Sequence, residues 1–205
     1  MKWILAVLVA MFGGYYIVRE SRMKRASVRK AVYKIIPTSL CALIGLIGAV
    51  QSGKTWPFFL FAGLGICISA DWLLEFHFLR GMGAFALAHV FYCIGYLLAG
   101  PFSPASLLIF AALFGMLCLI YARIHHKLEN ARLILCYACI LCVMASLACT
   151  RHPVLMVGAL LFVLSDTMIG LGMALKISRR GYGAGIMITY YAAQLLIALS
   201  TFLST

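Results

Sequence analysis

Acidic residues are scarce in this chain, and charge of either sign is rare. Of its 205 residues only 5 are Asp or Glu, against 17 Lys or Arg; charged residues make up 11% of the sequence and apolar residues 65%. This composition excludes a soluble domain with a polar surface and is typical of a protein that crosses the membrane several times. No linker or low-complexity tract interrupts it, so we predict a single membrane domain over residues 1–205.

Long apolar runs account for most of the sequence. Eight of them are long enough to cross a hydrocarbon core of about 30 Å as helices. We therefore predict an all-α membrane protein, a bundle of eight transmembrane helices. The predicted spans are residues 3–18, 35–51, 56–74, 83–99, 103–122, 132–149, 153–174 and 184–203.

Proline is missing from the middle of every predicted span. Transporters with discontinuous helices usually interrupt a span at its centre with Gly or Pro. The pattern therefore favours continuous helices over such a carrier. The five prolines all fall near predicted helix ends, at Pro37, Pro57, Pro101, Pro104 and Pro153.

Basic residues are concentrated in alternate connections between the spans. Fourteen of the 17 fall on one side, and only Lys2, Lys54 and Arg151 fall on the other. The positive-inside rule then predicts cytosolic basic loops and both termini on the non-cytosolic side. The basic residues are expected to face anionic headgroups, so the partners are membrane lipids and no nucleic acid is expected. The short length favours a bacterial cytoplasmic membrane over an animal endomembrane.

A metal site is not expected. The eight cysteines lie inside apolar runs, where they behave as small hydrophobic residues. Cys136, Cys139 and Cys142 repeat at every third position, but no His or acidic residue accompanies them in that run. A zinc hydrolase site would need about three in-membrane histidines, and only His89 lies inside a span. We predict no metal and no cofactor.

Both aspartates of the chain lie inside predicted spans, Asp71 in the third and Asp166 in the seventh. A charged, unpaired carboxylate at mid-helix costs about 2.5–3.5 kcal/mol in the membrane. No basic residue lies at comparable depth within a span, so neither aspartate is expected to have an ion-pair partner. Asp166 is about 15 Å from the cytosolic boundary along its helix. We predict that the two acids are functional.

Other polar side chains share this depth or these helix faces. Together with the aspartates they are expected to line a cavity open to the cytosolic leaflet. The alternative is that they only link helices by hydrogen bonds worth about 0.6 kcal/mol each. Lys34, at the cytosolic interface, either contacts a lipid phosphate or snorkels to the surface. The other candidates are Glu75, His89, Tyr92, Tyr96, Tyr190 and Gln194.

Several motifs now become recognisable together. The chain resembles the YhhN-like family of membrane proteins, the lysoplasmalogenases, in five of its eight spans from Lys34 onward. One departure is Ala70, where the family pattern has Gly before the first aspartate. The stretches that carry the resemblance are "YKIIPTSL", "ISADWLL", "FLRGMGAFALAHVFY", "GALLFVLSD" and "YYAAQLLIA".

The resemblance implies an eight-helix hydrolase that cleaves the sn-1 vinyl ether of lysoplasmalogens, a class of lysophospholipid, to a fatty aldehyde and glycerophosphocholine or glycerophosphoethanolamine. Protonation of a vinyl ether at its β-carbon leaves an oxocarbenium ion that water attacks. Asp71 and Asp166 would act as acid and base, as paired carboxyls do in glycoside hydrolysis, and their order stays open. His89 and Tyr190 would position water or stabilise charge, and Lys34 would contact the phosphate.

Three alternatives remain beside this one. A small proton-coupled transporter would use the two aspartates as proton sites. A lipid-binding or scaffolding protein would use them only for packing. Another lipid hydrolase, cleaving an ester or a phosphodiester, would draw on Ser165 beside Asp166, although no nucleophile-elbow motif is present.

Overall fold

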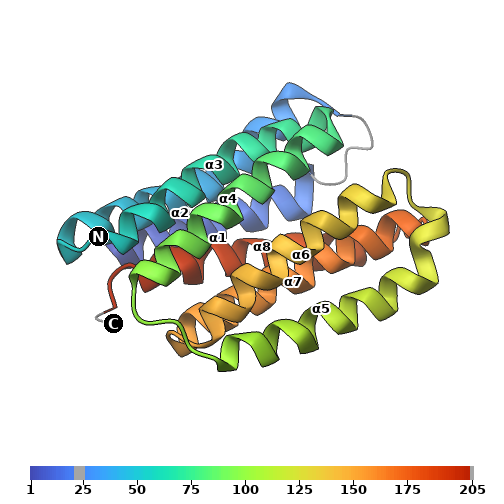
Figure 1. Ribbon diagram of the computed structural model, residues 1–205. Coiled ribbons are helices and arrows are strands. Elements are labelled where there is room, and N and C mark those ends of the chain that lie inside the picture. The colour runs from blue at the N-terminus through green and yellow to red at the C-terminus, as the bar shows by residue number, and fades with distance from the viewer. Residues whose placement is uncertain (21–25, 204–205) are drawn as a thin grey trace.

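Eight long helices make up the structure, a computed structural model that describes residues 1–20 and 26–203. All eight are long and apolar enough to cross a membrane, and the described residues contain no strand, so the predicted all-α, eight-helix architecture is confirmed (Figure 1). A π-helical turn, Tyr16–Glu20, continues the first helix. The helices are α1 Lys2–Tyr15, α2 Val28–Ser52, α3 Trp56–Phe76, α4 Phe78–Leu98, α5 Ala105–Ile124, α6 Ala131–Cys149, α7 Pro153–Ala174 and α8 Arg180–Ser200.

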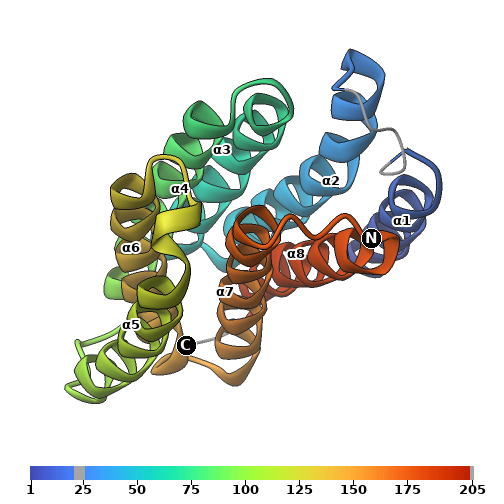
Figure 2. The same cartoon turned by 90° about the vertical axis from the view of Figure 1, so that its right-hand side faces the viewer.

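Six of the helices form a closed ring. Around it, α2 packs on α3, α3 on α4, α4 on α6, α6 on α7, α7 on α8, and α8 returns to α2 (Figure 2). Two helices lie outside this ring: α1 packs on α2 and α8, and α5 packs on α6. The start of α1 and the end of α8 lie at the same end of the bundle (Figure 1). Which side of the membrane they face stays a prediction.

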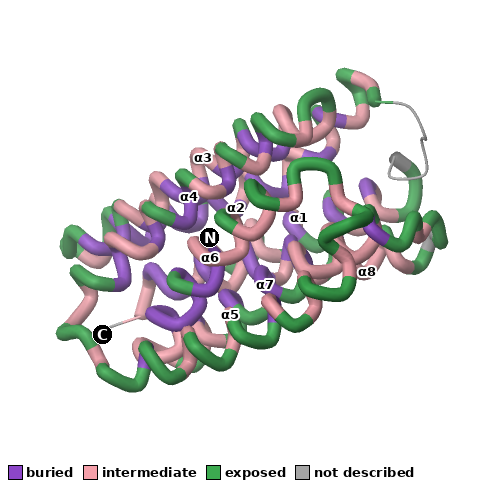
Figure 3. Tube along the Cα trace, turned by 45° about the vertical axis from the view of Figure 1, so that its right-hand side comes forward, coloured by how far each residue is buried: buried purple, intermediate pink, exposed green. Residues whose placement is uncertain are grey.

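The outer surface is apolar, as expected of a protein that contacts acyl chains. Figure 3 shows buried positions on the inward turns of the ring helices and exposed ones along α5. On α5, Leu108 is 76% exposed and Leu119 is 74% exposed. Only one side of α5 is therefore covered by protein.

The starts of three helices differ most from the predicted spans, and the largest difference concerns α2. It begins at Val28 rather than at residue 35, and Ser27 caps it by accepting a hydrogen bond from the Lys30 N–H (3.2 Å). Hydropathy misses this start because the first two turns are basic and lie outside the apolar run, although they are helical. Pro37 therefore lies within a helix, not near its end as predicted.

The other two differences have the same cause. The helix α4 begins at Phe78 instead of 83, and α8 runs from Arg180 to Ser200 instead of 184–203. Each of these starts includes an arginine, Arg80 in α4 and Arg180 in α8, and the predicted span begins only after it, although the helix already includes it. The predicted basic loop includes Arg22, Lys24 and Arg25, which lie outside the described residues.

The α3–α4 hairpin is the tightest connection, since His77 alone separates the two helices. A Cβ on Gly81 would lie 2.6 Å from both the Cα and the backbone N of Leu74. Only glycine permits this approach of α4 to α3. The close approach matters for the site, because it brings the start of α4 against the end of α3.

Gly81→Ala is therefore expected to destabilise the protein by about 1–3 kcal/mol, since the clash is with backbone that cannot rotate away. Thermal unfolding of the detergent-purified protein measures the effect. Gly83→Ala is the matched control, because a Cβ there meets nothing within 4 Å. Equal melting temperatures for the two variants would contradict the packing argument.

Candidate active site

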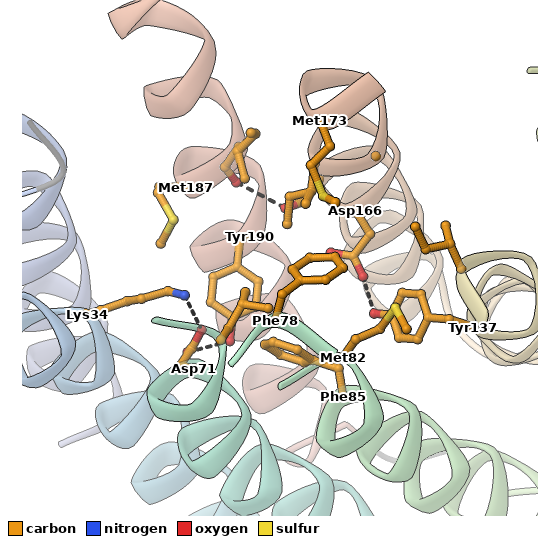
Figure 4. A pocket seen from close by; sticks show the side chains of 16 residues that line it. Lys34, Asp71, Phe78, Met82, Phe85, Tyr137, Asp166, Met173, Met187 and Tyr190 are labelled. Carbon is orange, nitrogen blue, oxygen red and sulfur yellow. Dashed lines mark hydrogen bonds and ion pairs between the residues drawn. The ribbon is translucent and has the colours of Figure 1, made fainter. Parts of the chain in front are cut away.

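A cavity opens inside the ring at the end of the bundle away from the chain termini. It encloses about 620 Å³, its open mouth included, and all six ring helices contribute to its wall (Figure 4). The lining side chains are Lys34 of α2; Asp71 and Leu74 of α3; Phe78, Met82 and Phe85 of α4; Ile134 and Tyr137 of α6; Ser165, Asp166, Ile169, Gly170 and Met173 of α7; and Ile186, Met187 and Tyr190 of α8.

Both aspartates line this one cavity, and they come from different helices. Figure 4 shows the two carboxyl groups apart from each other, with the rings of Tyr190 and Phe78 between them in that view. Most of the remaining wall is apolar. The arrangement places two carboxyl groups on the wall of one largely apolar cavity.

Asp71 is almost completely buried and is surrounded by donors. Its Oδ2 accepts hydrogen bonds from Thr38 Oγ1 (2.7 Å) and Tyr190 Oη (2.6 Å). Its Oδ1 is 3.3 Å from Lys34 Nζ, in an ion pair whose side chains are 1% and 8% exposed. Such partners are what a buried carboxylate requires, because an isolated one loses its hydration without compensation.

The ion pair corrects the prediction that neither aspartate has a basic partner. That prediction was wrong for Asp71 because α2 begins seven residues earlier than hydropathy indicates, so Lys34 is on an inward-facing helical turn. Lys34 and Thr38 are one turn apart and therefore contact the same neighbour.

Asp166 has a different environment. Tyr137 Oη donates a hydrogen bond to its Oδ2. Its Oδ1 accepts none within the described part of the chain, and no described cation pairs with it. The two carboxyls therefore differ in charge compensation: Asp71 has a lysine, and Asp166 has a neutral phenol.

His89 lies behind Tyr137 rather than on the cavity wall. Its Nε2 is 3.1 Å from Tyr137 Oη. Because the phenol gives its single proton to Asp166, the imidazole must donate from Nε2, which leaves Nδ1 as a buried nitrogen without a hydrogen-bond partner. His89 therefore orients the phenol that holds Asp166.

Tyr92 and Gln194 form a similar supporting group for Asp71. Gln194 Nε2 donates to Tyr190 Oη (3.0 Å), and Tyr92 Oη donates to Gln194 Oε1 (3.4 Å). Both side chains are fully buried, and neither lines the cavity. They hold Tyr190 in the position from which it donates to Asp71.

Glu75 is not part of the cavity wall. It forms an ion pair with Lys30 (2.8 Å), one helix turn beyond Asp71. Of the nine candidates named from the sequence, the structure thus brings Asp71, Asp166, Lys34 and Tyr190 to the cavity, and none of the other five lines it. Tyr96 is one of these five: it is buried, and its hydroxyl has no hydrogen-bond partner among the described residues.

Two site residues did not follow from the sequence analysis, Tyr137 and Thr38. The sixth span drew attention through its repeated cysteines, yet its one tyrosine is the residue that contacts Asp166. A phenol within an otherwise apolar span was the available signal. Among residues 1–20 and 26–203, no group of three His, Cys, Asp or Glu side chains gathers in a way that would hold a metal ion.

Comparison with family models matches residues 29–201 to the YhhN family. The chain belongs to the YhhN family. All the residues of the cavity lie within the matched range, as do seven of the eight helices almost entirely. The YhhN family is known for lysoplasmalogenase-like activity. No curated protein and no solved structure matches the chain.

Proposed function

We propose that this YhhN-family protein hydrolyses the sn-1 vinyl ether bond of lysoplasmalogens. The observation that carries the proposal is that Asp71 and Asp166 line one largely apolar cavity from separate helices. Vinyl ether hydrolysis needs one group that donates a proton to carbon. It needs a second group that stabilises the resulting cation and accepts a proton from the attacking water. Paired carboxyl groups supply these two functions in glycoside hydrolysis.

Asp166 is the proton donor in this proposal. A protonated carboxyl needs no counterion, and Asp166 has none among the described residues. Tyr137 occupies Oδ2, so Oδ1 is available for the transferable proton. The proton moves to the β-carbon of the vinyl ether, the carbon–carbon double bond becomes a single bond, and the positive charge appears on the ether oxygen and the α-carbon.

Asp71 is the carboxylate that stabilises this oxocarbenium ion and accepts a proton from the attacking water. Thr38, Tyr190 and Lys34 hold it in a fixed orientation. Water adds to the α-carbon and forms a hemiacetal. Its collapse breaks the carbon–oxygen bond and gives the aldehyde. The leaving glycerol oxygen takes the proton held by Asp71, and the hemiacetal hydroxyl gives its proton to Asp166, so both acids return to their starting state and one water is consumed in total.

Lys34 is the candidate contact for the headgroup phosphate. An ammonium has three N–H donors, and the ion pair with Asp71 uses one of them. Lys34 lines the same cavity as the two acids. A phosphate there would share the lysine with Asp71.

The test compares a lysoplasmalogen with its saturated-ether analogue on detergent-purified protein. Aldehyde should form from the vinyl ether alone, because the saturated ether has no carbon to protonate. In D₂O the aldehyde should carry one deuterium at its C2, the former β-carbon. Authentic aldehyde incubated in D₂O for the same time gives the background hydrogen–deuterium exchange, which is subtracted. Equal cleavage of both ethers, or no aldehyde from either, would refute the proposal.

Two alternatives predict other results. An ester-cleaving hydrolase would need Ser165 as nucleophile, but the Ser165 hydroxyl donates to the backbone carbonyl O of Ile186 (3.2 Å) and not to a base. A proton-coupled transporter would move a substrate across proteoliposomes without forming product.

A further inference from the structure

A second cavity adjoins the first on the outer side of α6 and α7. It encloses about 540 Å³ between these helices and α5. Four residues line both cavities: Ile134, Tyr137, Asp166 and Gly170. The two spaces therefore meet at Asp166 and its phenol partner.

The second cavity is apolar away from this junction. Leu117 and Ile120 of α5, Leu141 of α6 and Leu171 of α7 form much of its wall. The hydroxyl of Thr167, one of its few polar groups, already donates to the backbone carbonyl O of Val163 within its own helix (2.7 Å). A polar ligand would find little to bind there, whereas a hydrocarbon chain would lose no hydrogen bond on entering.

We infer that the second cavity is the binding site for the hydrocarbon chain of the lipid substrate and, after cleavage, for the chain of the fatty aldehyde. This inference rests on the proposed function and adds the position of the chain to it. A vinyl ether joins a polar glycerol to an apolar chain, so polarity changes at the bond that is cleaved. The charged groups of the protein are distributed in the same way: the ion pair of Lys34 and Asp71 lies only in the first cavity, and among the described residues the second cavity has no charged side chain except Asp166 at the junction.

The position of α5 supports entry of the chain from the membrane. This helix lies outside the ring, packs along α6 and has few contacts with α7. Its opposite face is exposed and apolar, with Leu119 74% exposed. A hydrocarbon chain that passes between α5 and α7 would move directly from the surrounding lipid into the second cavity, without passing the polar loops.

Neighbouring residues on α5 provide a matched test. Ile120 lines the second cavity, and Leu119 points away from it toward lipid. Ile120→Trp should lower kcat/KM for an 18-carbon lysoplasmalogen by at least about tenfold, the scale of excluding methylene groups from an apolar pocket. An 8-carbon substrate, whose chain ends nearer the junction, should change less than threefold. Leu119→Trp should change neither.

A labelling experiment tests the site without requiring cleavage. The probe is a saturated-ether lysophospholipid with a diazirine at the end of its chain, photolysed on the wild-type protein. Peptides from α5 and the part of α6 around Leu141 should carry the label, and an excess of unlabelled 18-carbon lysolipid should reduce it. Labelling confined to other helices overturns the inference, as does an equal loss of long- and short-chain activity in Ile120→Trp.

The two experiments separate this inference from the proposed function. Aldehyde release together with labelling elsewhere keeps the reaction and rejects the chain site. Labelling of α5 and α6 without aldehyde release keeps the chain site and rejects the reaction. If an excess of unlabelled lysolipid does not reduce the labelling, the second cavity takes up membrane lipid in general. This result also overturns the inference.

Discussion

Asp166→Asn is expected to lower aldehyde release by about 10²–10⁴-fold, the usual contribution of a general acid. An amide has nearly the size of the carboxyl and its oxygen still accepts the hydrogen bond from Tyr137, but it cannot protonate carbon. The variant should therefore unfold at close to the wild-type temperature. Steady-state aldehyde release by detergent-purified protein measures the loss.

Ser165→Ala is the matched control for this variant, since it alters the neighbouring residue on the wall of the same cavity. It should retain activity within about threefold of wild type, the limit expected of a side chain that takes no part in proton transfer. An active Asp166→Asn protein beside an inactive Ser165→Ala protein would reverse the assignment and favour serine chemistry.

Lys34→Met is expected to cost about 3–5 kcal/mol of stability, because it removes one partner of a buried ion pair and leaves the Asp71 carboxylate without a cation. The double variant Lys34→Met/Asp71→Asn should recover most of this loss, since no charge then remains in the pair. Thermal unfolding of the wild type, the two single variants and the double variant gives the coupling between the two sites.

Lys30→Met serves as the comparison. Lys30 lies on α2, as Lys34 does, and pairs with Glu75 of α3, but the Lys30 side chain is 18% exposed. Its effect should be smaller than that of Lys34→Met, since Lys30 keeps part of its hydration. A double variant as unstable as Lys34→Met alone would show that lost packing, and not the uncompensated charge, causes the effect.

The class of the protein and its number of helices follow from the sequence alone. Eight long apolar runs in a chain with 11% charged residues leave no other way to satisfy the backbone in lipid. The two aspartates were found by the same reasoning, because a carboxyl inside a span is costly enough to require a purpose.

The partners of those aspartates depended on tertiary structure. Hydropathy measures how favourably residues transfer from water into lipid, so a span predicted from it stops where charged residues begin. The helix itself can continue past that point. Lys34 consequently appeared to be an interfacial residue, whereas it lies on an inward turn of α2 beside Asp71.

The choice among the tyrosines was decided in the same way. Tyr92, Tyr137 and Tyr190 all lie within apolar helices. The helix α7, which carries Asp166, has its few polar residues in consecutive positions, so no polar stripe along it marks which face points inward. Only the order of helices around the ring sets Tyr137 beside Asp166 and Tyr190 beside Asp71. The sequence by itself determined that two acids lie within the spans of an eight-helix membrane bundle. The tertiary structure decided that they share one cavity and which donors hold each of them, because helix rotation is set by packing against neighbours and not by the residues of one helix.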